Sequence, residues 1–234
     1  NSKIISIVPA RVGSKGLKEK NFLDFAGKPL FKHAIEQGLR TTGSCIFSSD
    51  SLSAMRSTNQ LSIEKHMRKP ELCSDSATMS DVLLDIVQSF GLRDETVILL
   101  QPTSPLRTDA DIIKAIKLYQ KNHFDLVLSA TETDNTFLKC GRNDNDRFVP
   151  VSDVEYCFSN RQALPKIYKP NGMLFVFKAS WLLNNGGLRT NNIGMVPAER
   201  KYSIDVDNIA DFHEAERLYQ EDVLFTSSGK CFGH

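Results

Sequence analysis

The chain contains 234 residues, of which 29 are Lys or Arg and 28 are Asp or Glu, so its formal net charge is +1. Its hydrophobic fraction of 41% is enough to form a core, which excludes an intrinsically disordered chain, and its 13 glycines exclude a collagen-like one. The balanced charge gives no general attraction to nucleic acids or anionic membranes, so an anion-binding site must come from a local cluster of charges.

Strand and helix patterns alternate over the first 130 residues. Continuous apolar runs predict buried strands at 4–8, 45–48, 96–100 and 126–130, and helical spacing predicts helices over 29–40, 51–61, 78–90 and from 108 onward. Thr78 and Thr108 each precede an Asp by three residues, a capping-box pattern that predicts where two of these helices begin. In the helix after Thr108 the predicted apolar stripe consists of Ile112, Ile113, Ile116 and Tyr119. The alternation predicts a three-layer α/β fold with a Rossmann-like, mostly parallel sheet.

The alternation breaks at residues 136–170, where short apolar pieces surround a polar turn at 141–146. We interpret this segment as an inserted lobe with some antiparallel strand. A buried strand at 173–177 and an amphipathic helix at 209–219 then complete a single domain over residues 1–225. Residues 226–234 are expected to form a mobile tail.

No apolar run approaches the roughly 18–20 residues that a membrane-spanning helix needs. The first apolar run is expected to be a strand rather than a signal peptide. The five cysteines are odd in number, widely spaced and free of any C-x-x-C pattern, which argues against a disulfide framework or a zinc site. We therefore expect a cytoplasmic protein with neither a membrane nor a nucleic-acid partner.

A basic, glycine-containing loop follows the first predicted strand. It carries four positive charges, opposed only by Glu19: Arg11, Lys15, Lys18 and Lys20. Gly13 and Gly16 permit tight turns and close approach of a ligand, and backbone N–H and ammonium groups together can cradle a polyphosphate. The spacing matches neither the Walker A nor the G-x-G-x-x-G motif, so a solvated basic loop remains the alternative.

Two carboxylates, Asp205 and Asp207, lie two residues apart near the end of the chain. In an extended segment both would project to the same face, where their mutual repulsion is costly unless a cation lies nearby. Hard oxygen ligands of this kind suit Mg²⁺. The alternative for Asp207 is a helix cap, because it precedes the last predicted helix.

Five ordered motifs resemble those of the cytidylyltransferases that activate nonulosonic acids, namely the CMP-sialic acid synthetases and their CMP-legionaminate and CMP-pseudaminate relatives. The motifs are Ala10-Arg-x-Gly-Ser-Lys-Gly16 with Lys20-Asn21, Gln101-Pro-Thr-Ser-Pro-Leu-Arg-Thr108, Arg161-Gln-x-Leu-Pro165, Pro170-Asn-Gly172 and Ser203-Ile-Asp-x-Asp207. The likeness extends from about residue 4 to 220. It implies the fold of the nucleotide-diphospho-sugar transferases, a homodimer formed through residues 136–170, and transfer of CMP from CTP to a nonulosonic acid.

The resemblance also implies roles for particular residues. Lys20, Arg11 and Asp207 would be catalytic, with Asp205 and Asp207 holding Mg²⁺ or Mn²⁺. Nucleotide contacts would come from Ala10, Arg11, Gly13, Ser14, Lys15, Gly16, Lys20, Asn21, Arg68 and Thr78. Around Arg68 the match is imperfect, because Lys69-Pro70 replaces the usual order and Met79 stands where a hydroxyl is common.

Sugar contacts implied by the resemblance are Gln101, Thr103, Ser104, Lys139, Arg161, Gln162, Tyr168, Asn171 and Phe175. A bidentate Arg161 suits a sugar carboxylate, although a surface charge is the alternative, and Phe175 is expected to belong to the core. Lys169 replaces the Arg that usually precedes Pro-Asn-Gly. N-acetylneuraminate, legionaminate, pseudaminate and the shorter 3-deoxy-octulosonate remain alternative substrates, and a catalytically silent nucleotide-binding homologue is the rival of a different class.

Overall fold

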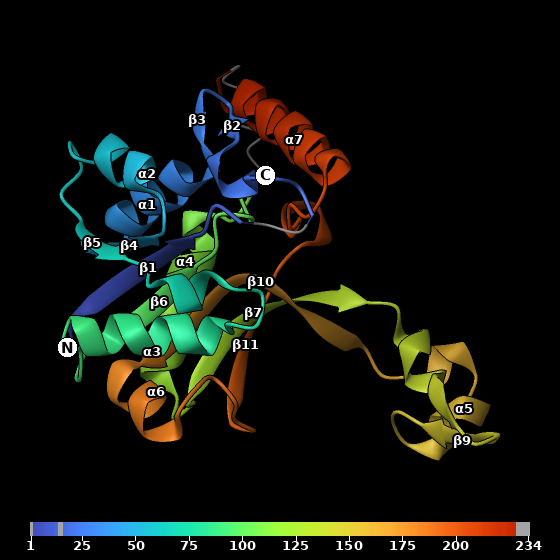
Figure 1. Ribbon diagram of the computed structural model, residues 1–234. Helices are drawn as coiled ribbons and strands as arrows, with labels where there is room; N and C mark the ends of the chain where they lie inside the picture. The colour runs from blue at the N-terminus through green and yellow to red at the C-terminus, as the bar shows by residue number, and fades with distance from the viewer. Residues whose placement is uncertain (1, 14–15, 228–234) are drawn as a thin grey trace.

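The computed structural model describes residues 2–13 and 16–227, and a seven-stranded sheet forms its centre (Figure 1). The strand order is β11-β7-β10-β6-β1-β4-β5. The strands are β1 (Ile4–Ala10), β4 (Cys45–Ser49), β5 (Glu64–Met67), β6 (Thr96–Leu100), β7 (Leu126–Thr133), β10 (Ile167–Lys178) and β11 (Ile193–Pro197). β10 is antiparallel to both neighbours and the other strands of this sheet are parallel to one another. The predicted α/β class with a mostly parallel sheet is confirmed.

The central strands follow from their apolar runs, since every residue of β4 and of β6 is buried. The two edge strands were not predicted. β5 is largely polar and only His66 in it is buried, while β11 buries alternate residues, Gly194 and Val196. An edge strand is covered on fewer sides and therefore lacks the continuous apolar run on which the prediction depended.

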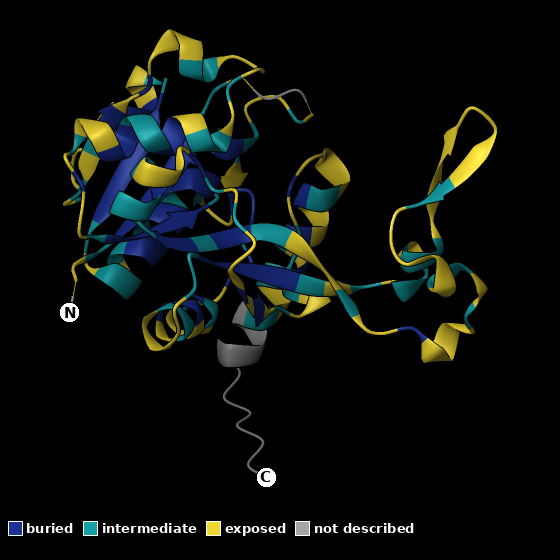
Figure 2. Ribbon diagram, turned by 90° about the horizontal axis from the view of Figure 1, so that it is seen from below, coloured by how far each residue is buried: buried dark blue, intermediate teal, exposed yellow. Residues whose placement is uncertain are grey.

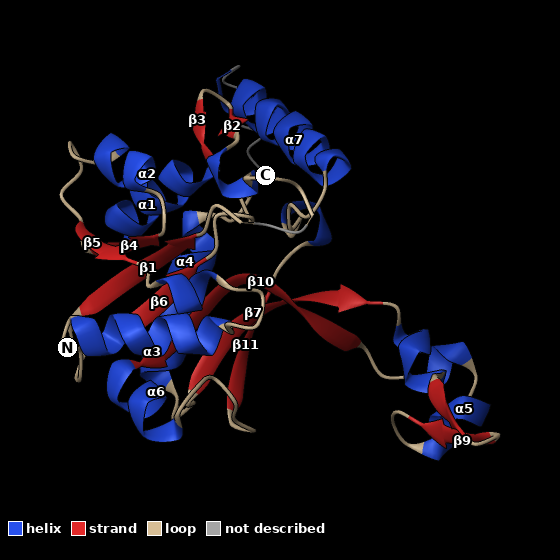
Figure 3. Cartoon of the chain, in the orientation of Figure 1, coloured by secondary structure: helices blue, strands red, loops and turns tan. Residues whose placement is uncertain are grey.

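Helices cover both faces of the sheet (Figures 1 and 3). α1 (Leu30–Thr42) and α4 (Asp109–Lys121) pack on one face, and α3 (Met79–Ser89) and α6 (Ala179–Asn185) pack on the other. The predicted capping boxes at Thr78 and Thr108 are both present. The predicted stripe of α4 is wrong in one position: Ile113 is 42% exposed, and Ala115 lies in the buried face with Ile112 and Ile116.

The carboxyl-terminal helix α7 (Ile209–Ser227) packs against a small hairpin of β2 (Asp24–Phe25) and β3 (Lys28–Pro29). Their contact forms a third apolar cluster that includes Phe25, Phe212 and Leu218. α7 begins where it was predicted and continues beyond residue 219. Thr226 and Ser227, which were assigned to the tail, lie in its last turn, and residues 228–234 lie outside the described part of the chain.

Between β7 and β10 the chain leaves the sheet as an arm, defined here as residues 134–166 (Figures 1 and 2). The arm contains a hairpin of β8 (Gly141–Asp144) and β9 (Arg147–Pro150) and the short helix α5 (Val154–Phe158). Residues 167–170 of the predicted lobe belong instead to β10, where they pair with β7. Large apolar side chains on the arm are exposed, Phe158 to 87%. Among the described residues no helix is long and apolar enough to cross a membrane.

Candidate active site

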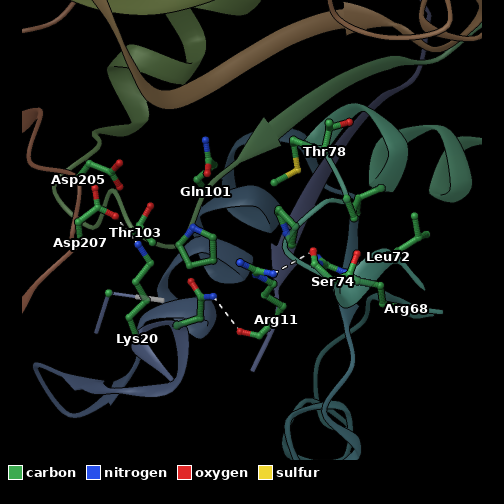
Figure 4. A pocket seen from close by; sticks show the side chains of 17 residues that line it. Arg11, Lys20, Arg68, Leu72, Ser74, Thr78, Gln101, Thr103, Asp205 and Asp207 are labelled. Carbon is green, nitrogen blue, oxygen red and sulfur yellow. Dashed lines mark hydrogen bonds and ion pairs between the residues drawn. The ribbon is translucent and has the colours of Figure 1, made fainter. Parts of the chain in front are cut away.

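A cavity of about 410 Å³ opens beyond the carboxyl ends of β1 and β6. This is the edge at which parallel sheets bind ligands. Ten of the predicted site residues line it: Arg11, Gly16, Lys20, Asn21, Arg68, Thr78, Gln101, Thr103, Asp205 and Asp207. Figure 4 shows Lys20 and the two aspartates at one end of the cavity and Arg68, Leu72 and Ser74 at the other.

The basic loop after β1 is held against two distant segments. Arg11 donates to the backbone oxygens of Cys73 and Ser74 at 3.0 and 3.2 Å, which fixes one wall of the cavity. Gly16 packs against the backbone of Asp207, and a Cβ at Gly16 would lie only 2.4 Å from that carbonyl oxygen. The glycine is therefore required for this contact between loop and aspartate segment, a reason that the sequence did not reveal.

Two of the predicted nucleotide contacts that the structure describes, Ala10 and Gly13, are not part of the cavity lining, and two others are not described. Ala10 is fully buried in β1. Gly13 lies outside the residues that border the cavity. Ser14 and Lys15 lie outside the described residues. Thr78 does border the cavity, but its hydroxyl is engaged with Asp81 in the capping box of α3.

Arg68 is buried, and two nitrogens of its guanidinium lack hydrogen-bond acceptors among the described residues. Arg68 is only 6% exposed. No described residue accepts a hydrogen bond from its Nε or Nη2. Burial lowers the pKa of this guanidinium. An unsatisfied buried donor costs free energy, and a ligand acceptor entering the cavity would remove that cost.

A buried polar network supports β5, the strand that directly precedes Arg68. His66 lies 3.0 Å from the Ser48 hydroxyl through Nδ1 and 3.0 Å from the Asp85 carboxylate through Nε2. Burial lowers the pKa of His66, although the neighbouring Asp85 carboxylate raises it. Because Asp85 belongs to α3, the network joins β4, β5 and the helix that forms the upper wall of the cavity.

Lys20, Asp205 and Asp207 form the end of the cavity opposite Arg68 (Figure 4). The Lys20 ammonium donates to Asp207 Oδ1 at 2.6 Å. Burial raises the pKa of Asp205, and the negative charge of Asp207 raises it further. The helix cap is supplied by Asn208, whose Oδ1 accepts from the Asp211 backbone N–H at 3.0 Å, which leaves the Asp207 carboxylate available to Lys20.

The pair fits a hard divalent cation. Two carboxylates of one short segment line the cavity. Burial and the charge of Asp207 disfavour the ionised form of Asp205, and a nearby cation would favour it. In the described ranges, no group of three or more His, Cys, Asp or Glu side chains is arranged to hold a metal ion. Asp205 and Asp207 could hold Mg²⁺, since this ion commonly takes one or two carboxylates from a protein and completes its shell with substrate phosphates and water.

The proline-containing loop after β6 is fixed by a residue that sequence reasoning did not single out. Arg107 is buried and donates through Nη1 to the carbonyl oxygens of Gln101 at 3.1 Å and Met173 at 2.6 Å. Burial lowers the pKa of Arg107 to about 9. The Val206 N–H donates to Thr103 O at 2.8 Å, so the same loop also positions the aspartate segment. An Arg inside a loop motif gives no sequence signal of such burial.

A second hollow of about 530 Å³ lies between β7, β10 and the segment before Asp205. Asp205 and Asp207 border it as well as the first cavity. Of the predicted sugar contacts, Asn171 and Phe175 line this hollow. The side-chain amide of Asn171 is already bonded to Ser129, Thr131, Ser203 and the Met173 N–H, so it organises the wall.

The remaining predicted sugar contacts lie elsewhere. Gln101 and Thr103 border the first cavity, and Ser104 is buried, facing a different hollow beside Tyr219. Tyr168 borders neither of the two hollows that meet at the aspartates. Lys139, Arg161 and Gln162 are on the arm: Lys139 donates to Ser159 O, and the other two border a separate hollow, where Arg161 lies 3.6 Å from Asp134. One chain alone thus does not bring the arm residues to the aspartates.

Nearly the whole sequence matches a known family. Residues 5–230 match the cytidylyltransferase family model, and the chain belongs to this family. It is 33% identical over 243 residues to N-acylneuraminate cytidylyltransferase of Streptococcus agalactiae, an alignment that covers 98% of this chain and 57% of that protein. It is 27% identical to CMP-N,N'-diacetyllegionaminic acid synthase of Legionella pneumophila, with 93% of this chain and 97% of that protein covered.

A solved structure of CMP:2-keto-3-deoxy-manno-octonic acid synthetase in complex with CTP shares the fold, with a TM-score of 0.73. Its sequence is 16% identical, and the match covers 94% of this chain and 100% of that one. The chain therefore spans a little over half of the streptococcal relative's length but nearly all of the length of the Legionella and octonic acid enzymes.

Proposed function

We propose that the chain transfers CMP from CTP to a nine-carbon acid sugar of the sialic acid type and releases pyrophosphate. The observation that carries this proposal is the position of Asp205 and Asp207, which border both the cavity of the basic loop and the hollow beside β10. Two substrates bound in the two spaces would meet at these carboxylates and at Lys20. Family membership and the names of the relatives support the same chemistry.

The nucleotide would occupy the first cavity. Arg68, with its unmet donors, suits the polar edge of a cytosine at one end, and Leu72 lies beside it. The triphosphate would extend along Arg11 and Gly16 to Lys20, where an ammonium group can stabilise the negative charge that develops on the α-phosphate and the leaving group. This orientation places the reacting phosphorus beside the second hollow.

The sugar hydroxyl would attack from the second hollow. Its oxygen forms a bond to the α-phosphorus while the bond from that phosphorus to the bridging oxygen breaks, so pyrophosphate leaves and the hydroxyl proton is released. Such chemistry depends on positioning and on neutralising charge. Mg²⁺ held by Asp205 and Asp207 would supply part of that neutralisation at the phosphate oxygens.

The arm is proposed to form a homodimer interface. Its exposed Phe137, Phe148, Val154 and Phe158 have no core of their own to enter. A second chain covering them would also explain why Arg161 lies away from the aspartates of its own chain. A cytoplasmic location remains a prediction from the absence of a long apolar run and from the cysteine pattern.

Pyrophosphate release with CTP and a panel of acid sugars tests the function. The panel comprises N-acetylneuraminate, legionaminate, pseudaminate and 3-deoxy-octulosonate, with UTP and ATP as nucleotide controls and Lys20→Met as the background control. Release with CTP and one nonulosonate is expected. Release with the eight-carbon sugar alone would replace the nine-carbon assignment, and binding of CTP without release for any sugar would favour a catalytically silent homologue.

A further inference from the structure

Residues on both sides of Arg68 in the chain are bound by one carboxylate, that of Asp85. Asp85 Oδ2 lies 3.0 Å from Nε2 of His66, which precedes Arg68 by two residues. The other oxygen, Oδ1, accepts from the ammonium of Lys69, the residue directly after Arg68. The side chain of Asp85 is only 11% exposed. A single buried carboxylate of α3 therefore holds the chain before and after Arg68.

The side chain of Arg68 depends on this support, because its own polar contacts are few. Its Nε and Nη2 are buried and have no hydrogen-bond acceptor among the described residues. Its backbone N–H donates to Ser49 O at 2.9 Å, which extends the pairing of β5 with β4. Because β5 is the edge strand of the sheet, only one neighbouring strand fixes it. Side-chain contacts such as those of Asp85 must supply the rest.

Asp85 also belongs to the helix that forms another wall of the nucleotide cavity. Met79 and Val82 of α3 line the cavity, and Asp85 lies about one turn beyond Val82. Asp85 itself does not line the cavity. Its contacts to His66 and Lys69 therefore fix the position of Arg68 relative to the wall that α3 forms.

We infer that Asp85 is a positioning residue for nucleotide binding, which holds the open donors of Arg68 where the base end of CTP would enter. This inference rests on the proposed function, in which Arg68 meets the cytosine. Without the carboxylate the end of β5 could shift, and binding would then have to restore the order that Asp85 now provides. An Asp in the middle of a predicted helix resembles an ordinary surface charge, so the sequence alone does not reveal this role.

The test is a double-mutant cycle with Arg68, measured as the dissociation constant for CTP with Mg²⁺ by isothermal titration calorimetry. Asp85→Leu removes both contacts and should weaken CTP binding about tenfold, within the range of a lost hydrogen bond to a charged group. In Arg68→Met protein the same change should alter the dissociation constant less than about twofold, because the residue that Asp85 positions is absent. Lys69→Gln removes one of the two contacts and should have a smaller effect in the same direction.

Lys65→Gln is the matched control. Lys65 is on the same strand, but its ammonium donates to Met55 O of α2 (Leu52–Ser57) at 2.7 Å instead of to α3. This variant should leave the dissociation constant for CTP unchanged. If Asp85→Leu does not fold, Asp85→Asn, which keeps the size and removes the charge, takes its place in the cycle.

An unchanged dissociation constant in the Asp85 variant overturns the inference, even if pyrophosphate release shows that the proposed function is right. Equal weakening in the wild-type and Arg68→Met backgrounds also overturns it, because Asp85 would then act by loosening the fold rather than by placing Arg68. If the two changes are coupled as expected but no acid sugar yields pyrophosphate, the inference holds and the proposed function fails. Absence of CTP binding by the wild-type protein overturns both.

Discussion

The two spaces that meet at Asp205 and Asp207 are built in different ways. In the cavity of the basic loop, most polar groups are already fixed by the chain: Arg11 is bonded to carbonyl oxygens, Lys20 to Asp207, and Arg68 is buried. In the hollow beside β10, the cations Lys169 and Arg200 are exposed and free of described partners. The side chains of the first space are preorganised by contacts within the chain. The cations of the second space would be neutralised by a bound ligand.

The difference follows from the position of each space in the fold. The first lies over the centre of the sheet, between parallel strands whose loops are packed by Arg107 and by the Gly16 contact. The second lies where β7 and β10 leave the sheet to form the arm. Under the proposed function, the nucleotide would be recognised by the body of the molecule, and the sugar would be recognised beside the root of the arm.

The largest effect is expected from the aspartates that both spaces share. Asp207→Asn should reduce turnover at least about 10³-fold and abolish its dependence on Mg²⁺, because metal ligation contributes several kcal/mol of charge stabilisation. Steady-state rates over a Mg²⁺ titration measure it. Asn208→Ala is the control: it removes the actual cap of α7, costing about 1 kcal/mol of unfolding free energy, and should keep the Mg²⁺ response. Normal activity of Asp207→Asn would show that the Asp207 carboxylate is not needed for metal binding or for the reaction.

Lys20→Met is expected to reduce turnover by roughly 10²–10³, equivalent to about 3–4 kcal/mol, since it removes a charge-assisted contact in the transition state. In the nucleotide-free protein the same variant should bind Mn²⁺ more tightly, because the ammonium no longer occupies the Asp207 carboxylate. Electron paramagnetic resonance of free Mn²⁺ gives the affinity. Unchanged Mn²⁺ affinity together with a near-normal rate would remove Lys20 from both roles.

Arg68→Met separates the two spaces. The KM for CTP should rise about tenfold to a hundredfold, as a lost hydrogen bond to a charged group costs about 1.5–3 kcal/mol, while the KM for the sugar stays the same. The melting temperature should hold or rise, because the variant removes a buried guanidinium whose Nε and Nη2 find no hydrogen-bond acceptor among the described residues. A higher KM for the sugar with an unchanged KM for CTP would exchange the assignments of the two spaces.

The smallest effect is expected on the arm. Phe158→Glu should weaken the proposed dimer by about 2 kcal/mol, the scale of a buried aromatic anchor, and leave the monomer folded because Phe158 is 87% exposed. Sedimentation velocity at micromolar concentrations measures the change. A wild-type protein that is already monomeric would remove the interface and any contribution of Arg161 to the hollow of a second chain.

The sequence predicted the residues of the cavity of the basic loop better than those of the hollow beside β10. The basic loop, the aspartate pair and both capping boxes depend on neighbours within a few residues, so spacing revealed them. The antiparallel direction of β10 and the role of Arg107 depend on contacts across 60 residues or more, such as the one from Arg107 to Met173. Local patterns carry no information about such pairings.

The sequence predicted which residue types belong to the site better than it predicted what each side chain contacts. Thr78 was predicted both to cap a helix and, by resemblance, to contact the nucleotide; it caps α3 and also borders the first cavity. Ser104 was assigned to the sugar by resemblance, but it is buried and faces another hollow. Arg68 was assigned to the nucleotide without any sign that it would be buried with unmet donors. Burial is decided by tertiary packing, which is why the strongest feature of the cavity could be seen only in the fold.

The central claim is that the cavity beside β1 holds CTP and presents its α-phosphate to the hollow beside β10. A crystal structure of the wild-type chain with CTP and Mg²⁺ tests it most directly. The account predicts the cytosine against Arg68, the triphosphate along Gly16 and Lys20, and the α-phosphate next to Asp205 and Asp207. Nucleotide density in the hollow lined by Arg200, or a triphosphate remote from Lys20, would contradict it.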